Sequence, residues 1–80
     1  MKKLQDPDYK PDENTKSEIE RLHREGESLS GLQLSFADLK NANLVDADLE
    51  SCDLKRANLS NASMYGANLE GADLFKADLE

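Results

Sequence analysis

The fold is decided by the stretch ADLKN ANLVD ADLES CDLKR ANLSN ASMYG ANLEG ADLFK ADLE, residues 37–80, which repeats a five-residue pattern without a break. Each unit has a leucine or methionine at its centre and a small residue two positions earlier. The nine centres are Leu39, Leu44, Leu49, Leu54, Leu59, Met64, Leu69, Leu74 and Leu79. Because a five-residue unit is too small to bury its own apolar face, the units must stack on one another. The repeat therefore predicts a solenoid with these centres as its core.

Neither a continuous helix nor a continuous strand accommodates this pattern. On an α-helix a five-residue step advances about 500°, so successive centres would lie about 140° apart and spiral over every face. On a strand, where side chains alternate between two faces, an odd repeat would send successive centres to opposite sides. Within one unit, however, the small residue and the centre share a face. We therefore expect very short extended segments separated by corners, in a chain that coils around its own leucines.

The A(D/N)LXX pattern resembles the pentapeptide repeat family. It fills nine consecutive units over residues 37–80, and its five-residue phase extends back to Leu29. The departures are Cys52 at a small position, Ser63 in place of Asp or Asn, and Met64 at a centre, and all three are close in size to the residues they replace. The resemblance implies a right-handed quadrilateral β-helix with four units, or twenty residues, per coil. Eleven centres counted from Leu29 then make a β-solenoid of fewer than three coils.

The chain before the repeats divides into two parts. Residues 1–13 contain two prolines, many charges and almost no apolar side chains, so we expect a flexible charged tail. Residues 14–26 are expected to form a capping helix, and residues 27–80 the pentapeptide-repeat β-helix. Since the end of a β-solenoid exposes apolar core and unpaired backbone, some cover of the first coil is physically required.

The expected capping helix runs over about residues 16–25. Thr15-Lys16-Ser17-Glu18 offers a capping box, Ile19 and Leu22 lie on one side at helical spacing, and Gly26 supplies a stop. Its narrow apolar side suits a lid better than an independent domain. We expect this lid to cover Leu29, Leu32 and Leu34.

The repeat carries little that catalysis or metal binding would need. Cys52 is expected to face inward as a substitute for alanine, and the lone His23 reads as a solvated surface histidine. The repeat carboxylates have no pocket that would shift their pKa values. The acidic group around Asp48 lacks the glycine turn and terminal glutamate of a calcium loop. We therefore expect no enzyme activity, no catalytic residues, no cofactor and no metal.

The net charge and the hydropathy of the chain limit the classes of partner that we expect. The net charge is −7, which disfavours nucleic acid as a ligand. No apolar run approaches the length of a membrane span, and the first residues lack the apolar stretch of a signal peptide. These features favour a cytoplasmic location.

Twenty-residue stacking predicts which surface residues lie together. Phe36 should stack with Arg56 and Lys76, and Lys55 with Phe75, which gathers aromatic and cationic side chains at one corner. Val45 and Tyr65 should form a small apolar ridge, beside an acidic side that includes the stacked pair of Glu50 and Glu70. The candidate interaction residues are Phe36, Lys55, Arg56, Tyr65, Phe75, Lys76 and Leu79.

These features favour a non-catalytic protein-interaction or scaffold module. The pattern continues unchanged to Glu80, so we expect an uncapped C-terminal coil through which the chain could self-associate or bind a protein partner. An alternative comes from the resemblance, because some family members are acidic rods that mimic DNA and bind DNA gyrase. The acidic balance fits that alternative, whereas fewer than three coils make a short rod.

Overall fold

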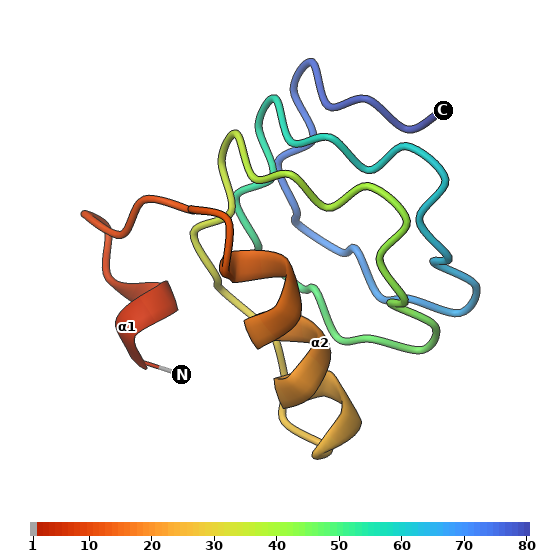
Figure 1. Ribbon diagram of the computed structural model, residues 1–80, viewed down its shortest axis with the longest axis horizontal. Helices are drawn as coiled ribbons and strands as arrows, with labels where there is room; N and C mark the ends of the chain where they lie inside the picture. Colours follow the sequence, from red (N-terminus) through yellow and green to blue (C-terminus); the bar gives the residue numbers. More distant parts are fainter. Residues whose placement is uncertain (1) are drawn as a thin grey trace.

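In the computed structural model, which describes residues 2–80, two helices precede a stack of coils (Figure 1). Helix α1 spans Lys2–Gln5 and helix α2 spans Thr15–Arg24. The coils are joined by isolated parallel bridges, each between residues twenty apart. The bridged pairs are Gln33 with Asp53, Asp38 with Asn58, Asn43 with Ser63, Asp48 with Asn68, Asp53 with Asp73, and Asn58 with Asp78. The described residues therefore form a short β-solenoid held by single bridges, with no longer strand among them.

Each unit ends in a tight turn, so a twenty-residue coil has four corners. The N–H of each small residue donates to the carbonyl of the preceding centre, as Ala37 does to Leu34 at 3.0 Å. The third residue of each turn has a positive φ, for example 60° at Asp46 and 73° at Gly66. These are the features of a type II turn, which places one residue in the left-handed region. A Cβ at position 66 would also clash with the carboxylate of Asp46. Glycine is therefore favoured at this corner both by the positive φ and by the lack of space for a side chain.

The Asp or Asn before each centre has a local structural role. Its side chain accepts a hydrogen bond from the backbone N–H two residues later, as Asp38 does from Lys40 at 3.2 Å and Asn58 from Ser60 at 2.9 Å. Such bonds satisfy backbone groups where no helix or continuous ladder is available. This accounts for the second letter of the repeat.

The core is closed at the N-terminal end and open at the other. The centres from Leu29 to Leu54 have no exposed surface, and Leu59 is 2% exposed. In the last coil every inward residue is at least partly exposed. These residues are Ala62, Met64, Ala67, Leu69, Ala72, Leu74, Ala77 and Leu79.

The N-terminal segment differs from the expected flexible tail. Among residues 2–13, α1 buries Leu4 completely, Tyr9 packs against the core, and Lys3 lies 3.5 Å from the Glu18 carboxylate. The Leu4 carbonyl also accepts a hydrogen bond from the N–H of Gln33 at 2.8 Å. Two apolar side chains thus anchor a stretch that is otherwise charged. Met1, the first residue of the expected tail, lies outside the described residues.

Helix α2 begins and ends one residue earlier than expected, and it covers the first coil. Ile19 is fully buried and Leu22 nearly so, in one apolar cluster with Leu29, Leu32 and Leu34. The expected capping box is absent from this helix. Asn14 occupies the N-cap position without a side-chain hydrogen bond. Thr15 lies inside the helix, where its hydroxyl is 2.6 Å from the Tyr9 hydroxyl and accepts from the N–H of Asp12 at 2.8 Å.

His23 is partly exposed, as a surface histidine would be, but it also makes a hydrogen bond that the sequence did not predict. Its Nε2 lies 2.7 Å from the carbonyl oxygen of Val45 in the first coil. Because a carbonyl can only accept, Nε2 is the donor. The sequence around His23 does not indicate this bond, because the acceptor is a backbone carbonyl twenty-two positions away.

The molecule measures 27 × 26 × 25 Å, so it is not a rod. Neither of its two helices within residues 2–80 is long and apolar enough to cross a membrane.

Candidate protein-interaction surface

One corner of the solenoid carries large exposed side chains. Phe36 is 72% exposed and Phe75 is 59% exposed. The guanidinium carbon of Arg56 lies 6.0 Å from the centre of the Phe36 ring, and the Lys76 ammonium lies 5.5 Å from that of Phe75. We call these four residues, Phe36, Arg56, Phe75 and Lys76, the aromatic corner. The Phe36–Arg56 contact agrees with the predicted twenty-residue stacking. Lys76 instead lies over the ring of its sequence neighbour Phe75, and the predicted contact between Lys55 and Phe75 is not among the observed ones.

The backbone of the aromatic corner is unusual. Phe36, Arg56 and Lys76 all have positive φ, at 67°, 59° and 57°. The same turn position is occupied at the other corners by glycine or by the small polar residues Asn, Asp and Ser. The left-handed region costs a residue with a bulky side chain about 1–2 kcal/mol. Bulky side chains at this turn position are therefore confined to one corner of the described solenoid.

Lys55 belongs to a different group from the aromatic corner. Its ammonium lies 3.0 Å from Asp53 and 3.3 Å from Asp73, two carboxylates that are bridged neighbours in one column. The side-chain hydrogen bond to Asp53 raises the pKa of Lys55, against a lowering by desolvation, and Asp73 adds to the rise. Burial alone would raise the pKa of Asp53, but the hydrogen bonds and charge of Lys55 outweigh it, and the pKa is lowered. The charge of Lys55 is thus already neutralised within the chain.

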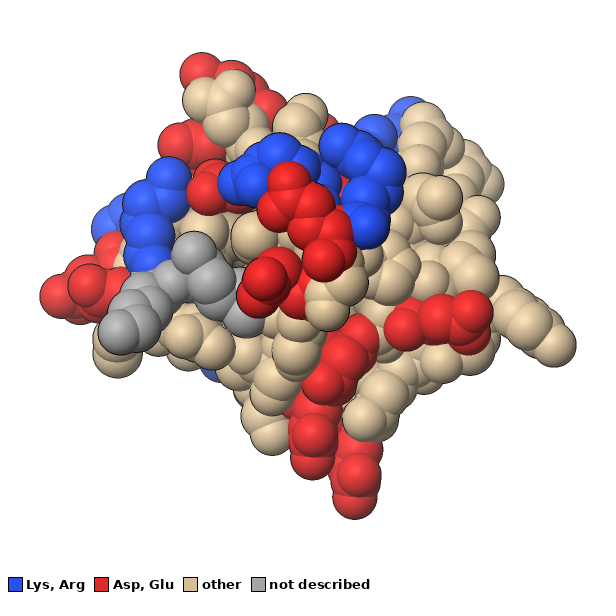
Figure 2. All heavy atoms as spheres, turned by 90° about the horizontal axis from the view of Figure 1, so that it is seen from below, with Lys and Arg blue, Asp and Glu red and all other residues tan. Residues whose placement is uncertain are grey.

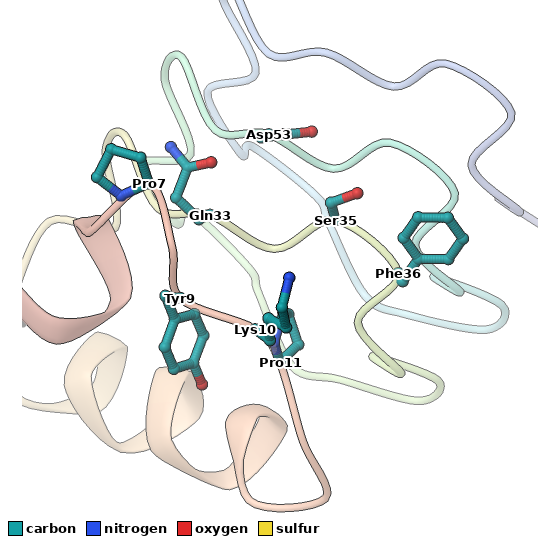
Figure 3. Close-up of a pocket in the computed structure, with 8 residues that line it drawn as sticks. All are labelled: Pro7, Tyr9, Lys10, Pro11, Gln33, Ser35, Phe36 and Asp53. Carbon is teal, nitrogen blue, oxygen red and sulfur yellow. The ribbon is translucent and has the colours of Figure 1, made fainter.

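A groove lies beside the aromatic corner (Figure 3). It has a volume of about 340 Å³ and separates the arm between the two helices, residues 6–14, from the first coils. We call it the arm groove. Its walls are Pro7, Tyr9, Lys10 and Pro11 from the arm, and Gln33, Ser35, Phe36 and Asp53 from the solenoid. Phe36 belongs to both features, so the arm groove and the aromatic corner form one continuous surface.

The arm residues of this groove were not among the predicted interaction residues, because residues 1–13 were expected to be flexible. Leu4 and Tyr9 were the available signal, as the only large apolar or aromatic side chains between Met1 and Glu13. Both pack against the core and bring the arm to the surface of the first coil.

The remaining candidate residues lie elsewhere. Tyr65 is 84% exposed on the corner that it shares with Val45, and Leu79 is 58% exposed in the last coil. The seven candidates therefore divide between the aromatic corner, the Lys55 ion-pair group, the Tyr65 corner and the open end.

The acidic side chains are dispersed among bases and hydrogen-bond donors. Figure 2 shows basic and acidic side chains intermixed on one face of the molecule. The Ser28 hydroxyl donates to Asp48 at 2.7 Å, and this bond, followed by the N–H of Glu50, lowers the pKa of Asp48. Within residues 2–80 no group of three or more His, Cys, Asp or Glu side chains is arranged to hold a metal ion.

Cys52 is buried at a small position of the repeat, as predicted. Its sulfur lies 2.9 Å from the Leu29 carbonyl oxygen, and burial raises the pKa of the thiol to about 11. A buried thiol with so high a pKa is a poor nucleophile at neutral pH.

Comparison with known proteins places the repeat. The sequence model of the pentapeptide repeats matches residues 42–80 in eight copies. No curated protein matches the chain. The structure carries the same turns and bridges back to Gln33 and Leu34, before the matched segment begins. Residues 42–80 of this chain are therefore pentapeptide repeats.

Proposed function

We propose that this chain is a small right-handed quadrilateral β-helix that acts as a non-catalytic protein-interaction module and binds its partner at the aromatic corner and the arm groove. Pentapeptide repeat proteins are often interaction modules, which supports the general class. The interior supports it as well, since Leu and Ala side chains fill the coils and the thiol of Cys52 is buried. The surface is therefore the part of the molecule available for function.

The observation that carries the proposal is the composition of the aromatic corner. Phe36 and Phe75 are held outside the core, each beside a cation. Aromatic residues and arginine are enriched in protein interfaces and dominate their binding energy. A second wall nearby, formed by Pro7, Tyr9 and Pro11 in the arm groove, extends the apolar surface that a partner can cover.

Charge at this surface favours an acidic partner segment. Among the described residues, no carboxylate lies within ion-pair distance of Lys10, Arg56 or Lys76, whereas Lys55 is held by Asp53 and Asp73. The proposed partner is a protein segment with an aromatic or aliphatic side chain flanked by Asp or Glu. Its apolar side chain would pack against the exposed rings, and its carboxylates would meet the unpaired cations.

The DNA-mimic alternative has less support. Its acidic charge remains, but a molecule of nearly equal dimensions lacks the long shape of a duplex, and cations interrupt its surface. Self-association through the C-terminal coil is a second candidate, favoured by the partly exposed apolar residues of that coil.

The test uses three short synthetic peptides, each with one phenylalanine flanked by Glu, by Gln or by Lys, and measures binding to the full chain by fluorescence anisotropy. We expect the Glu-flanked peptide to bind tightest and the Lys-flanked peptide weakest. The variant Phe36→Ser/Phe75→Ser should weaken binding about tenfold, which corresponds to about 1.4 kcal/mol. Arg56→Glu/Lys76→Glu should reverse the order of the three peptides.

Tyr65→Ser is the matched control, because it removes an equally exposed aromatic ring from another corner. It should leave all three affinities unchanged. If Phe36→Ser/Phe75→Ser left the affinities unchanged, or if none of the three peptides bound, the assignment of this surface would be overturned.

A further inference from the structure

The two ends of the solenoid carry complementary sets of backbone groups. Between coils the N–H of a centre donates forward, as Leu34 does to Asp53 at 2.7 Å, and so does the N–H of a corner residue, as Phe36 does to Lys55 at 2.9 Å. The N–H before a centre donates backward, as Asp53 does to Leu32 at 2.9 Å. Each unit thus offers two donors and one acceptor to the following coil, and one donor and two acceptors to the preceding coil.

The last coil has this forward-facing set without a partner. The N–H groups of Met64, Gly66, Leu69, Gly71, Leu74 and Lys76 occupy the forward-donating positions, and they find no hydrogen-bond partner among residues 2–80. The inward side chains of the same coil are partly exposed, and Leu79 is mostly so. A following coil would accept hydrogen bonds from these donors and would bury the exposed apolar side chains.

The first coil has the backward-facing set, and the N-terminal segment fills part of it with four hydrogen bonds. The Leu4 carbonyl and the Glu20 carboxylate accept from the N–H groups of Gln33 and Asn43, both at 2.8 Å. The Gln5 amide donates to the Ser30 carbonyl at 3.1 Å, and His23 Nε2 donates to that of Val45 at 2.7 Å. A preceding coil would provide these same donors and acceptors through its backbone. The N-terminal segment therefore provides, at these four positions, the hydrogen-bonding groups that the edge of a coil would provide.

We propose that residues 2–26 occupy the binding site for the last coil of a second copy of this chain, so that releasing them allows copies to stack head to tail. The donor-rich last coil matches the acceptor-rich first coil. Two last coils placed against each other would instead bring two donors per acceptor from both sides and leave donors unpaired. Ile19 and Leu22 cover apolar surface that the exposed leucines of the second copy would cover in their place. Since the two ends are different surfaces, the contact does not close on itself and copies can continue to add.

This inference rests on the two ends and uses none of the four residues of the aromatic corner, although release of residues 2–26 would remove one wall of the arm groove. The test uses the full chain with the release variant Ile19→Asp/Leu22→Asp, which leaves every repeat residue intact. Light scattering should show the wild-type chain without such stacks, and the release variant as particles of many times the 8.9 kDa chain mass. Arg21→Ser, on the exposed side of the same helix, is the matched control and should behave as the wild type.

Two further arms identify the contact. Adding Leu74→Lys/Leu79→Lys to the release variant should return it to the monomer, because both changes place charge on the donor end. Wild-type chain added to the release variant should shorten the particles, since its open last coil can join a stack while its covered first coil stops growth. The Leu74→Lys/Leu79→Lys chain with an intact N-terminal segment should not shorten them.

Circular dichroism decides whether the solenoid stays folded in the release variant. If it does not, Gln5→Ala/Glu20→Ala/His23→Ala replaces it, because that variant removes the side-chain hydrogen bonds and keeps the apolar cover. A folded release variant that remains monomeric would overturn the proposal. So would particles whose size is unaffected by the two lysines and by added wild-type chain.

Discussion

Leu59 and Leu79 provide a matched pair for measuring how the core weakens along the solenoid. They occupy the same position of the repeat, and the bridge between Asn58 and Asp78 places them one coil apart in one column. Leu59 is 2% exposed and Leu79 is 58% exposed. The same substitution, Leu to Ala, therefore removes the same atoms from two very different environments.

The expected losses of unfolding free energy differ accordingly. A fully buried Leu→Ala change costs about 2–5 kcal/mol, because it loses the burial of the side chain and leaves a cavity. Leu79 buries about four tenths of its surface, and its loss leaves no enclosed cavity, so we expect about 1 kcal/mol or less. A chain of this length has a total stability of roughly 4–12 kcal/mol. Leu59→Ala should thus remove a large share of it, and Leu79→Ala a small one.

Urea denaturation followed by circular dichroism gives both values, provided that the slopes of the two transitions agree. Each protein is measured at two concentrations, since association through the last coil would add a concentration-dependent term at Leu79. Leu59→Ala should cost at least twice as much as Leu79→Ala. Equal losses at both concentrations would refute the conclusion that the last coil is open.

Two further predictions concern titration and reactivity. The pKa of Asp53 is lowered in the fold, so its stabilising effect is present above its ordinary value and lost as pH falls through the folded value. The urea midpoint should therefore drop below about pH 4. Lys55→Met should reduce the midpoint at neutral pH and approach the wild type in acid, whereas a constant difference would contradict the ion pair. Burial raises the pKa of Cys52 to about 11, so its thiolate fraction alone should slow reaction with a disulfide reagent at pH 8 by about a hundredfold. Unfolding in urea should restore the ordinary rate of labelling. Rapid labelling of the native chain would contradict the buried environment of the thiol.

The coil geometry could be predicted because the repeat and the fold share one period. An inward residue every five positions, with a small residue two before it, requires a corner in each unit whatever the identity of the outward residues. The Asp and Asn side chains reinforce that corner locally, as Asp38 does toward Lys40. Stacking at a spacing of twenty residues then predicts that Phe36 lies beside Arg56, as it does in the structure. The number of units per coil came from the family resemblance, not from the period.

The N-terminal segment could not be predicted in this way. Leu4 and Tyr9 are isolated apolar residues without a period, and their burial depends on a surface that the first coil creates. The hydrogen bonds of Glu20 and His23 go to backbone groups of that coil, which no side-chain pattern records. Lys55 illustrates a third limit, because a long flexible side chain can reach either of two neighbouring columns. It takes the carboxylates of Asp53 and Asp73 in place of the predicted contact with Phe75.

The backbone gives a reason for the proposed binding role that exposure alone does not. Exposed apolar side chains are common on protein surfaces and need no explanation. Residues with bulky side chains in the left-handed region do, because each is disfavoured there by about 1–2 kcal/mol relative to a corner that glycine or asparagine could fill. In this solenoid Phe36, Arg56 and Lys76 all occupy that conformation, at one corner of the coil. None of these three side chains is buried in the core, and the contacts of Arg56 and Lys76 with the two rings offset only about 0.5–1 kcal/mol each at an exposed site. Contacts with a partner at the aromatic corner would offset the remainder, and this is why the backbone conformation supports the proposed binding role.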